Sequence, residues 1–330
     1  MAGKFLILGA NSFSGATFAD FVAESGHDVI ATSRSAQPSD AFLPYKWQRR
    51  AGNVRFETID LNHDLGKLDA LLKAERPTHV VNFAAQSMVG QSWDNPDHWM
   101  MTNVVSTVQL HDCLRKCDWL EKYVHVTTPE VYGSTEGWVR EDAPFNPSTP
   151  YAVSRAAADM SLRTYVNQYG FPAVSTRAAN VFGPGQQLYR IIPRTILMAL
   201  TGGKLTLDGG GISTRSFITM RDVSDATLKV ALSGKVGDTY HISTDRMISI
   251  RELVEKIFCD LNCDFESHVT VGPERPGKDS AYMLDSKKIR AELGWKDQET
   301  LEDGLAQAVA WALKFKDELV ATDPNYVHKP

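Results

Sequence analysis

Short apolar runs alternate with longer amphipathic segments through the first half of the chain. The apolar runs predict buried strands at residues 5–8, 29–32, 54–58, 79–83, 123–127 and 173–177. Segments of helical period lie between several of them, at residues 67–75, 107–117 and 151–169. Strands and helices in alternation require right-handed crossovers. The sequence therefore predicts an α/β protein with a Rossmann-type, doubly wound parallel sheet.

The pattern changes after about residue 180. Glycine and proline cluster in "VFGPGQ", "TGGKLTLDGGG" and "GPERPGKD", and strict alternation is lost. We expect residues 1–180 to form the Rossmann domain. Residues 181–330 are expected to form mainly a smaller mixed α/β lobe, interleaved with the end of the first domain. The last stretch, "DPNYVHKP", is expected at the surface.

Composition excludes several classes of partner. The 330 residues carry a formal net charge of −5, which gives no global attraction to nucleic acid or to a membrane surface. The first apolar run has only five residues before the glycines begin, too few for a signal peptide, and no later stretch approaches a membrane span. We expect a cytoplasmic protein without a nucleic-acid or membrane partner.

The four cysteines form two pairs at helical spacing, Cys113 with Cys117 and Cys259 with Cys263. Zinc sites usually show the tighter C-x-x-C spacing together with histidine partners. We interpret these residues as reduced, mostly buried thiols and predict no metal. A zinc site built from both pairs is the alternative.

A glycine-containing stretch, "LGANSFSGATFADF", follows the first strand and opens a helix. Gly9 and Gly15 lie where a strand turns tightly into a helix whose N-terminus can receive a pyrophosphate. Ser12 stands at the usual middle glycine and keeps a backbone N–H with a small side chain. This position in a βαβ series predicts a dinucleotide site. Its predicted contacts are Gly9, Asn11, Ser12, Phe13, Ser14 and Gly15.

The second strand ends in "VIATSRSAQ", without the acidic residue that holds a ribose 2′-hydroxyl in NAD sites. Ser33 and Arg34 stand there instead, and a planar guanidinium suits a 2′-phosphate. We therefore predict tightly bound NADP, with NAD as the alternative. After the third strand, Asp60 and its neighbour Leu61 are predicted to contact the adenine, although Asp60 as a loop cap is equally compatible.

Two further stretches carry candidate chemistry. "TTPEVYG" places Thr128 and Glu130 two positions apart, and "TPYAVSRAAAD" places Tyr151 four residues before Arg155, one helical turn away. Each alone is compatible with a strand end or a helix start. Their joint occurrence after a nucleotide-binding half predicts a catalytic centre.

These motifs resemble a known family. "GANSFSG", "NFAAQSMVGQS", "TTPEVYG", "TPYAVSR", "TRAANVFGPGQ", "STRSFITMRDV" and "ERPGKD" occur in the order found in extended short-chain dehydrogenases. The subgroup resembled is the nucleotide-sugar 4,6-dehydratases, including the dTDP-glucose and GDP-mannose enzymes, over residues 4 to about 313. The resemblance implies further cofactor contacts at Ala84, Ala85, Gln86 and Asn103.

The resemblance also implies roles for the candidate catalytic residues. Tyr151 would remove the C4 hydroxyl proton of a sugar nucleotide as hydride passes to the nicotinamide, with Thr128 hydrogen-bonded to the C4 oxygen. Glu130 would take the C5 proton, the C6 hydroxyl would leave, and hydride would return to C6. The implied product is a 4-keto-6-deoxy sugar nucleotide.

Two residues depart from the family pattern. Arg155 replaces a lysine that favours the tyrosinate; it keeps the charge but has a planar fork. Pro129 replaces the aspartate that protonates the leaving hydroxyl in the dTDP-glucose branch, and a serine in the GDP-mannose branch. Proline has neither a proton to donate nor a backbone N–H. Glu130 would then return its own proton to the leaving oxygen.

A sugar nucleotide needs cationic donors for its diphosphate. By resemblance, Arg215 and Arg275 grip the diphosphate, Asn180 bonds a phosphate, Ser87 lines the sugar path and Arg190 adds a contact. The nucleobase stays open among guanine, thymine, uracil and cytosine. Relatives pair through the helix near residues 93–119 and the Tyr151 helix, which implies a homodimer.

Other functions remain as alternatives. A C4 epimerase or C4 dehydrogenase would share the oxidation step, and pentose-forming decarboxylases also carry Thr-x-Glu. A non-catalytic dinucleotide sensor would explain the departures at Ser12, Pro129 and Arg155. Glu130 favours elimination over epimerisation.

Overall fold

A seven-stranded parallel sheet forms the centre of the computed structural model, which describes residues 2–47, 54–273 and 283–330. The strand order is β11-β7-β5-β4-β1-β2-β3. The strands are β1 (Lys4–Leu8), β2 (Asp28–Ser33), β3 (Val54–Thr58), β4 (His79–Asn82), β5 (Lys122–Thr127), β7 (Ala173–Ala178) and β11 (Thr239–Ile242). Every neighbouring pair is parallel, so the predicted doubly wound sheet is confirmed.

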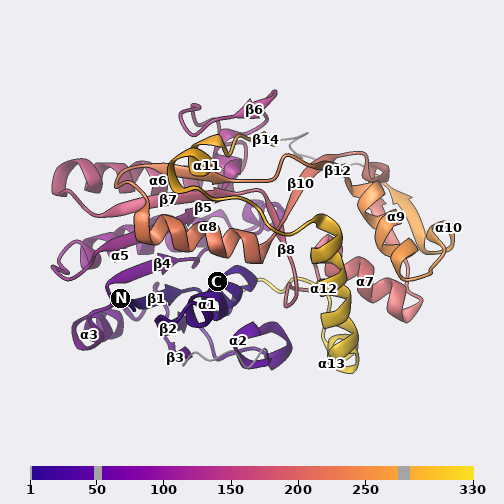
Figure 1. Cartoon of the computed structure of the whole chain (residues 1–330), viewed down its shortest axis with the longest axis horizontal. Helices are drawn as coiled ribbons and strands as arrows, with labels where there is room; N and C mark the ends of the chain where they lie inside the picture. Colours follow the sequence, from indigo (N-terminus) through magenta and orange to yellow (C-terminus); the bar gives the residue numbers. More distant parts are fainter. Residues whose placement is uncertain (1, 48–53, 274–282) are drawn as a thin grey trace.

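Helices cover both faces of this sheet, as the apolar runs of its central strands require. On one face, α1 (Phe13–Glu24) and α8 (Met220–Ser233) pack over Phe5 and Ile7. On the other, α3 (Leu65–Glu75), α5 (Thr107–Leu114) and α6 (Pro150–Tyr169) bury leucines against Leu6 and Leu8. Figure 1 shows α8 in front of the sheet and α5 behind it. Successive residues of β1 thus belong to two separate cores.

The start of α6 follows from local sequence. Thr149 caps the helix by accepting from the Ala152 N–H at 3.1 Å, and Pro150 occupies the first turn, where its missing N–H costs nothing. The helix ends at Gly170, whose φ of 60° is left-handed. Tyr151 is thereby fixed in the first turn of the helix, beside the carboxyl end of the sheet.

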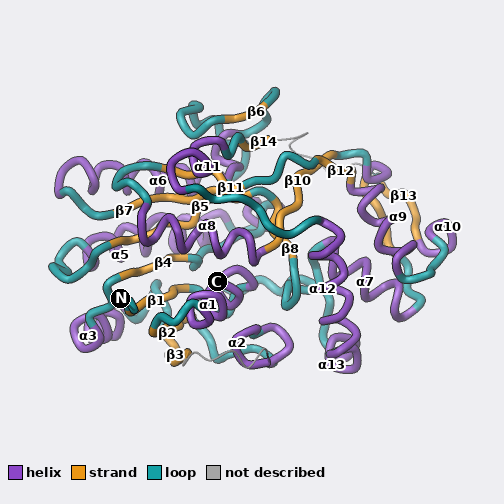
Figure 2. The backbone as a smooth tube through the Cα atoms, in the orientation of Figure 1, coloured by secondary structure: helices purple, strands orange, loops and turns teal. Residues whose placement is uncertain are grey.

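The second lobe contains two small sheets. One joins β8 (Asn180–Phe182), β10 (Thr214–Thr219) and β12 (Met247–Ser249); the other joins β9 (Leu205–Asp208) and β13 (Val269–Gly272). Its core packs α7 (Ile191–Thr201), α9 (Ile250–Asp260) and α12 (Leu301–Lys314). Figure 2 shows the mixed strands and helices of this lobe. The other elements are α2 (Pro44–Trp47), α4 (Pro96–Met100), β6 (Trp138–Val139), α10 (Phe265–His268), β14 (Met283–Leu284), α11 (Lys287–Leu293) and α13 (Lys316–Ala321).

The chain passes between the two parts more than once. Both α8 and β11 come after residue 181, yet they pack on and complete the seven-stranded sheet. After α13, residues 322–330, here called the tail, run back from the second lobe toward α1 (Figure 1). Within the described part of the chain, no helix is both long and apolar enough to cross a membrane.

Candidate active site

The turn between β1 and α1 has the geometry that the glycine motif predicts. Gly9 has a φ of +79°, and a Cβ there would lie 2.6 Å from the Ala84 nitrogen. A Cβ on Gly15 would lie 2.4 Å from the Gly9 oxygen. Ser12 caps α1: its hydroxyl accepts from the Gly15 N–H at 3.1 Å and donates to the Gly9 oxygen at 2.7 Å. The helix N-terminus therefore opens at the carboxyl end of β1, ready to receive an anion.

The neighbouring predicted contacts fall into two groups. Asn11 donates to the main-chain oxygens of Ser35 and Ala36, at 2.9 and 3.0 Å, which fixes the segment after β2 beside the glycine turn. Ser33, Ser14 and Arg34 are partly exposed here. The side chain of Phe13, by contrast, is buried in the apolar core with α1 and α8. The structure gives that side chain a packing role.

Asp60 and Leu61 follow β3. Asp60 accepts from the Asn62 N–H at 2.8 Å, which is the loop-cap alternative to an adenine contact. Leu61 is buried in the core that includes α3. The predicted adenine contact of Asp60 stays a prediction, with one carboxylate oxygen already engaged in the turn.

The segment after β4 is held by Asn103, which lies in a π-helical turn, Met101–Ser106. Its Oδ1 accepts from the main-chain N–H of Gln86 at 2.8 Å. Its Nδ2 donates to the main-chain oxygen of Gln86 and to Ser154 Oγ, both at 2.9 Å. Ser154 Oγ in turn donates to the main-chain oxygen of Tyr151 at 2.7 Å. Asn103, predicted as a cofactor contact, thus ties the segment containing Ala84, Ala85 and Gln86 to the Tyr151 helix.

The candidate catalytic residues converge at the carboxyl end of β5. The hydroxyl of Thr128 lies close enough to the phenol of Tyr151 to favour its ionised form, and the Glu130 carboxylate lies close enough to oppose that ionisation electrostatically. Thr128 also caps a 3₁₀ turn, Pro129–Tyr132, by accepting from the Glu130 N–H at 3.3 Å. Pro129 stands at the first position of this turn, where a backbone N–H is not needed. Pro129 therefore fits the local backbone, although the family pattern has a polar residue at this position.

Electrostatics around Tyr151 oppose its ionisation. Burial raises the pKa of the Tyr151 phenol, and the negative charge of Glu130 raises it further. Arg155, the Thr128 hydroxyl and Arg190 act in the other direction but do not outweigh burial. The expected help from Arg155 is therefore present, while the pKa of the phenol stays above its ordinary value.

Arg155 is almost completely buried. Its Nη2 donates to the Val126 oxygen on β5. Within the described residues, its buried Nε–H has no hydrogen-bond partner. One terminal nitrogen of the guanidinium is thus hydrogen-bonded to the main chain of β5. A lysine in the same place has a single ammonium and would not need this hydrogen bond.

The predicted substrate contacts are more dispersed. Arg190, exposed just before α7, is near enough to Tyr151 to lower the pKa of its phenol. Asn180 Nδ2 donates to the main-chain oxygen of Ser216 at 3.2 Å, and Arg215 Nη1 donates to the main-chain oxygen of Thr214 at 2.9 Å. Ser87 is exposed. Arg275 lies outside the described residues. Of this set, the structure brings Arg190 to the catalytic residues.

A buried polar network beneath the site was missed from the sequence. Asp159 Oδ2 lies 2.7 Å from Arg177 Nη2, and Arg177 Nη1 donates to the Tyr132 hydroxyl at 2.7 Å. That hydroxyl lies 2.8 Å from His241 Nε2, and His125 Nε2 lies 3.4 Å from Asp159 Oδ1. Charged and histidine residues inside otherwise apolar strands are the signal that could have indicated it.

Within the described ranges, no group of three or more His, Cys, Asp or Glu side chains could hold a metal ion. The Cys113 and Cys117 pair borders the core under α3, and Cys263 packs in a different core beside α9. The two pairs therefore do not form the alternative zinc site.

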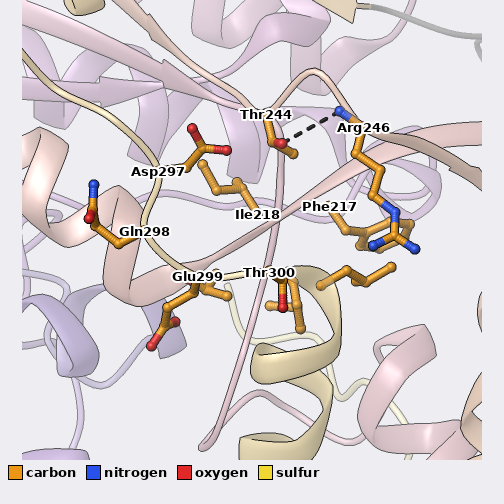
Figure 3. A pocket seen from close by; sticks show the side chains of 11 residues that line it. Phe217, Ile218, Thr244, Arg246, Asp297, Gln298, Glu299 and Thr300 are labelled. Carbon is orange, nitrogen blue, oxygen red and sulfur yellow. Dashed lines mark hydrogen bonds between the residues drawn. The ribbon is translucent and has the colours of Figure 1, made fainter.

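A separate hollow of about 250 Å³ lies between β10 and the segment before α12 (Figure 3). Two of its charged lining groups are in ion pairs: Arg246 donates to both carboxylate oxygens of Glu302 at 2.6 and 2.9 Å, and Asp297 lies 2.8 Å from Arg290. Among the residues the structure describes, none of the predicted site residues lines this hollow. We therefore place the candidate active site at the strand ends.

A doubly wound sheet, a capped glycine turn after β1 and a Thr–Tyr pair beside the carboxyl end of β5 define an extended short-chain dehydrogenase. Comparison with known proteins specifies the family further. The family model for GDP-mannose 4,6 dehydratase matches residues 6–308. The chain belongs to this family of nucleotide-sugar 4,6-dehydratases.

Individual relatives agree with this assignment. A dTDP-glucose 4,6-dehydratase of Neisseria meningitidis is 30% identical over 335 residues, covering 95% of this chain and 94% of the relative. One of Xanthomonas campestris is 34% identical, covering 74% of each chain. The structure of DesIV, a dTDP-glucose 4,6-dehydratase from Streptomyces venezuelae with NAD and TYD bound, is 31% identical with a TM-score of 0.87, covering 96% of this chain and 98% of that one.

Proposed function

We propose that this protein is a nucleotide-sugar 4,6-dehydratase that converts a nucleoside-diphosphate hexose to its 4-keto-6-deoxy form. The observation that supports this most directly is the convergence of Thr128, Glu130 and Tyr151 at the end of β5. Oxidation at C4 needs a base for a hydroxyl proton, and elimination needs a second base for the C5 proton. This cluster provides one group for each.

The residues divide the proton transfers between them. Tyr151 takes the C4 hydroxyl proton while Thr128 orients the same oxygen through its hydroxyl. Glu130 takes the C5 proton, which the C4 ketone makes acidic. Pro129 offers no proton, so Glu130 passes the C5 proton to the C6 oxygen as water leaves. A proton from solvent then replaces it at C5 as hydride returns to C6. When bound, the dinucleotide supplies the hydride acceptor at C4 and the hydride donor at C6.

The cofactor is proposed to be a nicotinamide dinucleotide. The cradle fits one, because Gly9 and Gly15 bring the backbone and the α1 N-terminus together where a side chain would block approach. DesIV and a Bacillus anthracis dTDP-glucose 4,6-dehydratase, 28% identical with a TM-score of 0.86, are both described with NAD. The sequence-based preference for NADP rests on Arg34, so the choice between the two depends on what Arg34 contacts.

A homodimer is also proposed. Four large apolar side chains are exposed on the π-helical turn and on the neighbouring face of α6: Met101, Val105, Val153 and Met160. The two elements contact each other, so these side chains extend one surface. An exposed apolar surface of this kind marks an interaction site, and a second copy of the chain would cover it.

Turnover of sugar nucleotides tests the proposed activity. Purified protein incubated with GDP-, dTDP-, UDP- and CDP-hexoses is expected to remove one water from at least one of them, as read by mass spectrometry. The variant Tyr151→Phe, which keeps the ring but loses the phenol, serves as the matched control and is expected to leave the substrate intact. Equal conversion by both proteins would contradict the proposal.

A further inference from the structure

The tail, residues 322–330, lies against residues predicted to bind the dinucleotide. Figure 1 marks its end over the part of the molecule that holds the seven-stranded sheet, away from α13. The main-chain oxygen of Lys329 accepts from Gln86 Nε2 at 2.6 Å and from Arg34 Nη2 at 3.2 Å. The main-chain oxygen of Pro330 accepts from Arg34 Nη1 at 2.5 Å. Both terminal nitrogens of Arg34 are therefore engaged by tail oxygens.

Side chains of the tail anchor it independently of Arg34. The ring of His328 stacks on Trp99 with 5.0 Å between centroids and 13° between planes, and its Nε2 lies 2.8 Å from His98 Nδ1. Tyr326 packs edge-on against Tyr189, with centroids 5.4 Å apart. Aromatic contacts of this kind hold the tail in place just before the two residues that contact Arg34.

Arg34 directly follows β2, beside the glycine turn, where Rossmann-type sheets read the 2′ substituent of the adenosine ribose. An unengaged guanidinium there would bind a 2′-phosphate through two parallel N–H groups. A phosphate would have to displace the oxygens of Lys329 and Pro330, whose partial negative charge also repels it. A 2′-hydroxyl carries no charge and can be accommodated without displacing these oxygens.

We propose that the tail is a determinant of cofactor specificity: its main-chain oxygens occupy the Arg34 donors that a 2′-phosphate requires and so select NAD over NADP. This deepens the cofactor part of the proposed function. Arg34 is typical of an NADP site, yet two similar solved structures are described with NAD. The engagement of Arg34 by the tail would account for this difference. In this chain the acidic residue usual for NAD is replaced by oxygens from a remote segment.

Direct binding measurements test the proposal. Dissociation constants for NAD⁺ and NADP⁺ are measured by calorimetry on dinucleotide-free protein, in the full chain and in a chain ending at Thr322. The full chain is expected to prefer NAD⁺. Removal of residues 323–330 is expected to shift the NAD⁺-to-NADP⁺ preference toward NADP⁺ about tenfold or more, the size expected for hydrogen bonds to a charged group. An unchanged ratio would overturn the proposal.

A second background isolates Arg34. In Arg34→Ser, the same truncation is expected to leave the ratio unchanged, because the donor on which the tail acts is gone. In the full-length chain, His328→Ala loosens an anchor and is expected to shift the ratio in the same direction as truncation. Val327→Ala, on the exposed side of the same segment, is the matched control and is expected to change nothing.

The remaining outcomes also decide the question. If truncation weakens both dinucleotides equally, the tail is only a cover; if it tightens both equally, the tail is only a competitor. Either result would refute a role in selectivity. Because the readout is dinucleotide binding, it stands even if no sugar nucleotide is dehydrated, so failure here and failure of the proposed activity are separate results.

Discussion

The guanidinium of Arg177 lies 2.7 Å from the carboxylate of Asp159, and both side chains are almost completely buried beneath the candidate active site. Asp159 also accepts from the Thr127 hydroxyl at 3.1 Å, and Arg177 donates to the Tyr132 hydroxyl. Thr127 immediately precedes Thr128, the cap of the 3₁₀ turn Pro129–Tyr132, and Tyr132 is the last residue of that turn. The ion pair thus fixes both ends of the segment that carries Thr128 and Glu130.

Breaking this pair is expected to cost stability. Arg177→Met leaves the Asp159 charge buried without its partner, so we expect a loss of about 3–5 kcal/mol in the free energy of unfolding. Urea denaturation measures it. The matched control is Arg246→Met, which breaks an exposed pair with Glu302 and is expected to cost at most about 1 kcal/mol. Equal losses in the two variants would show that the buried pair has no special role.

Acid is expected to destabilise the protein through its buried histidines. Burial and the Arg177 charge lower the pKa of His241 from its ordinary value of 6.5 to about 3. Between these values the unfolded chain binds the proton and the folded chain does not. Stability from this group is therefore full above about pH 6.5 and falls as the pH drops toward 3, at up to about 1.4 kcal/mol per pH unit.

The variant His241→Asn is expected to reduce the slope of unfolding free energy against pH in that range. The reduction corresponds to about one fewer proton taken up on unfolding, or up to about 1.4 kcal/mol per pH unit. Urea titrations at several pH values provide the slope, which does not depend on the absolute stability of the variant. The exposed His63→Gln is the control and is expected to keep the parent slope. Asp159 contributes separately: burial would raise the pKa of its carboxyl, but Arg177 and His125 lower it to about 2, so its contribution is lost only below about pH 4.

Substitution of Arg155 tests whether it fills the lysine role. Arg155→Lys is expected to preserve or raise the turnover rate, because the charge stays one turn from Tyr151 and the ammonium can approach a ligand more freely. Tyr151→Phe is expected to lose about 10²–10⁴-fold, the usual contribution of a positioned acid–base group. A fall of Arg155→Lys to the level of Tyr151→Phe in steady-state assays would contradict the assignment.

Pro129 is expected to limit the elimination step. Pro129→Asp introduces a proton donor at the first position of a 3₁₀ turn, where an acidic residue is well tolerated, and is expected to speed water loss by up to about a hundredfold. Rapid-quench assays of the keto-deoxy product measure this rate. Pro129→Ala removes the ring without adding an acid and is expected to leave the rate unchanged. A similar gain from alanine would assign the effect to backbone freedom.

Much of the fold could be predicted because periodicity is a local signal. All six predicted strands are present, with ends within a residue or two, and the helix behind Pro150 begins where its cap indicates. The seventh strand, β11, was not predicted, because its four residues lie in the half of the chain that lacks regular alternation. Its place beside β7 is decided by packing over a long sequence separation.

Part of the arrangement of the candidate site could be predicted for the same reason. Thr128 and Tyr151 are candidates because each follows a recognisable strand end or helix cap, and their catalytic roles stay predictions. Asn103 is a predicted cofactor contact, but its hydrogen bonds to Gln86 and Ser154 could not be read from spacing. Arg34 was placed correctly after β2, whereas its contact with residues about 295 positions away has no local signature.

The proposed dehydration is tested most directly by counting the hydrogens that the sugar loses and gains in a single turnover in heavy water. Sugar nucleotides are incubated with the protein in deuterium oxide, and the sugar is analysed by mass spectrometry. The proposed mechanism predicts loss of one water and gain of one deuterium at C5, both abolished in Glu130→Gln. An unchanged sugar mass, or loss of two hydrogens with reduced cofactor accumulating, would contradict it and would mean that this chain stops at oxidation of C4.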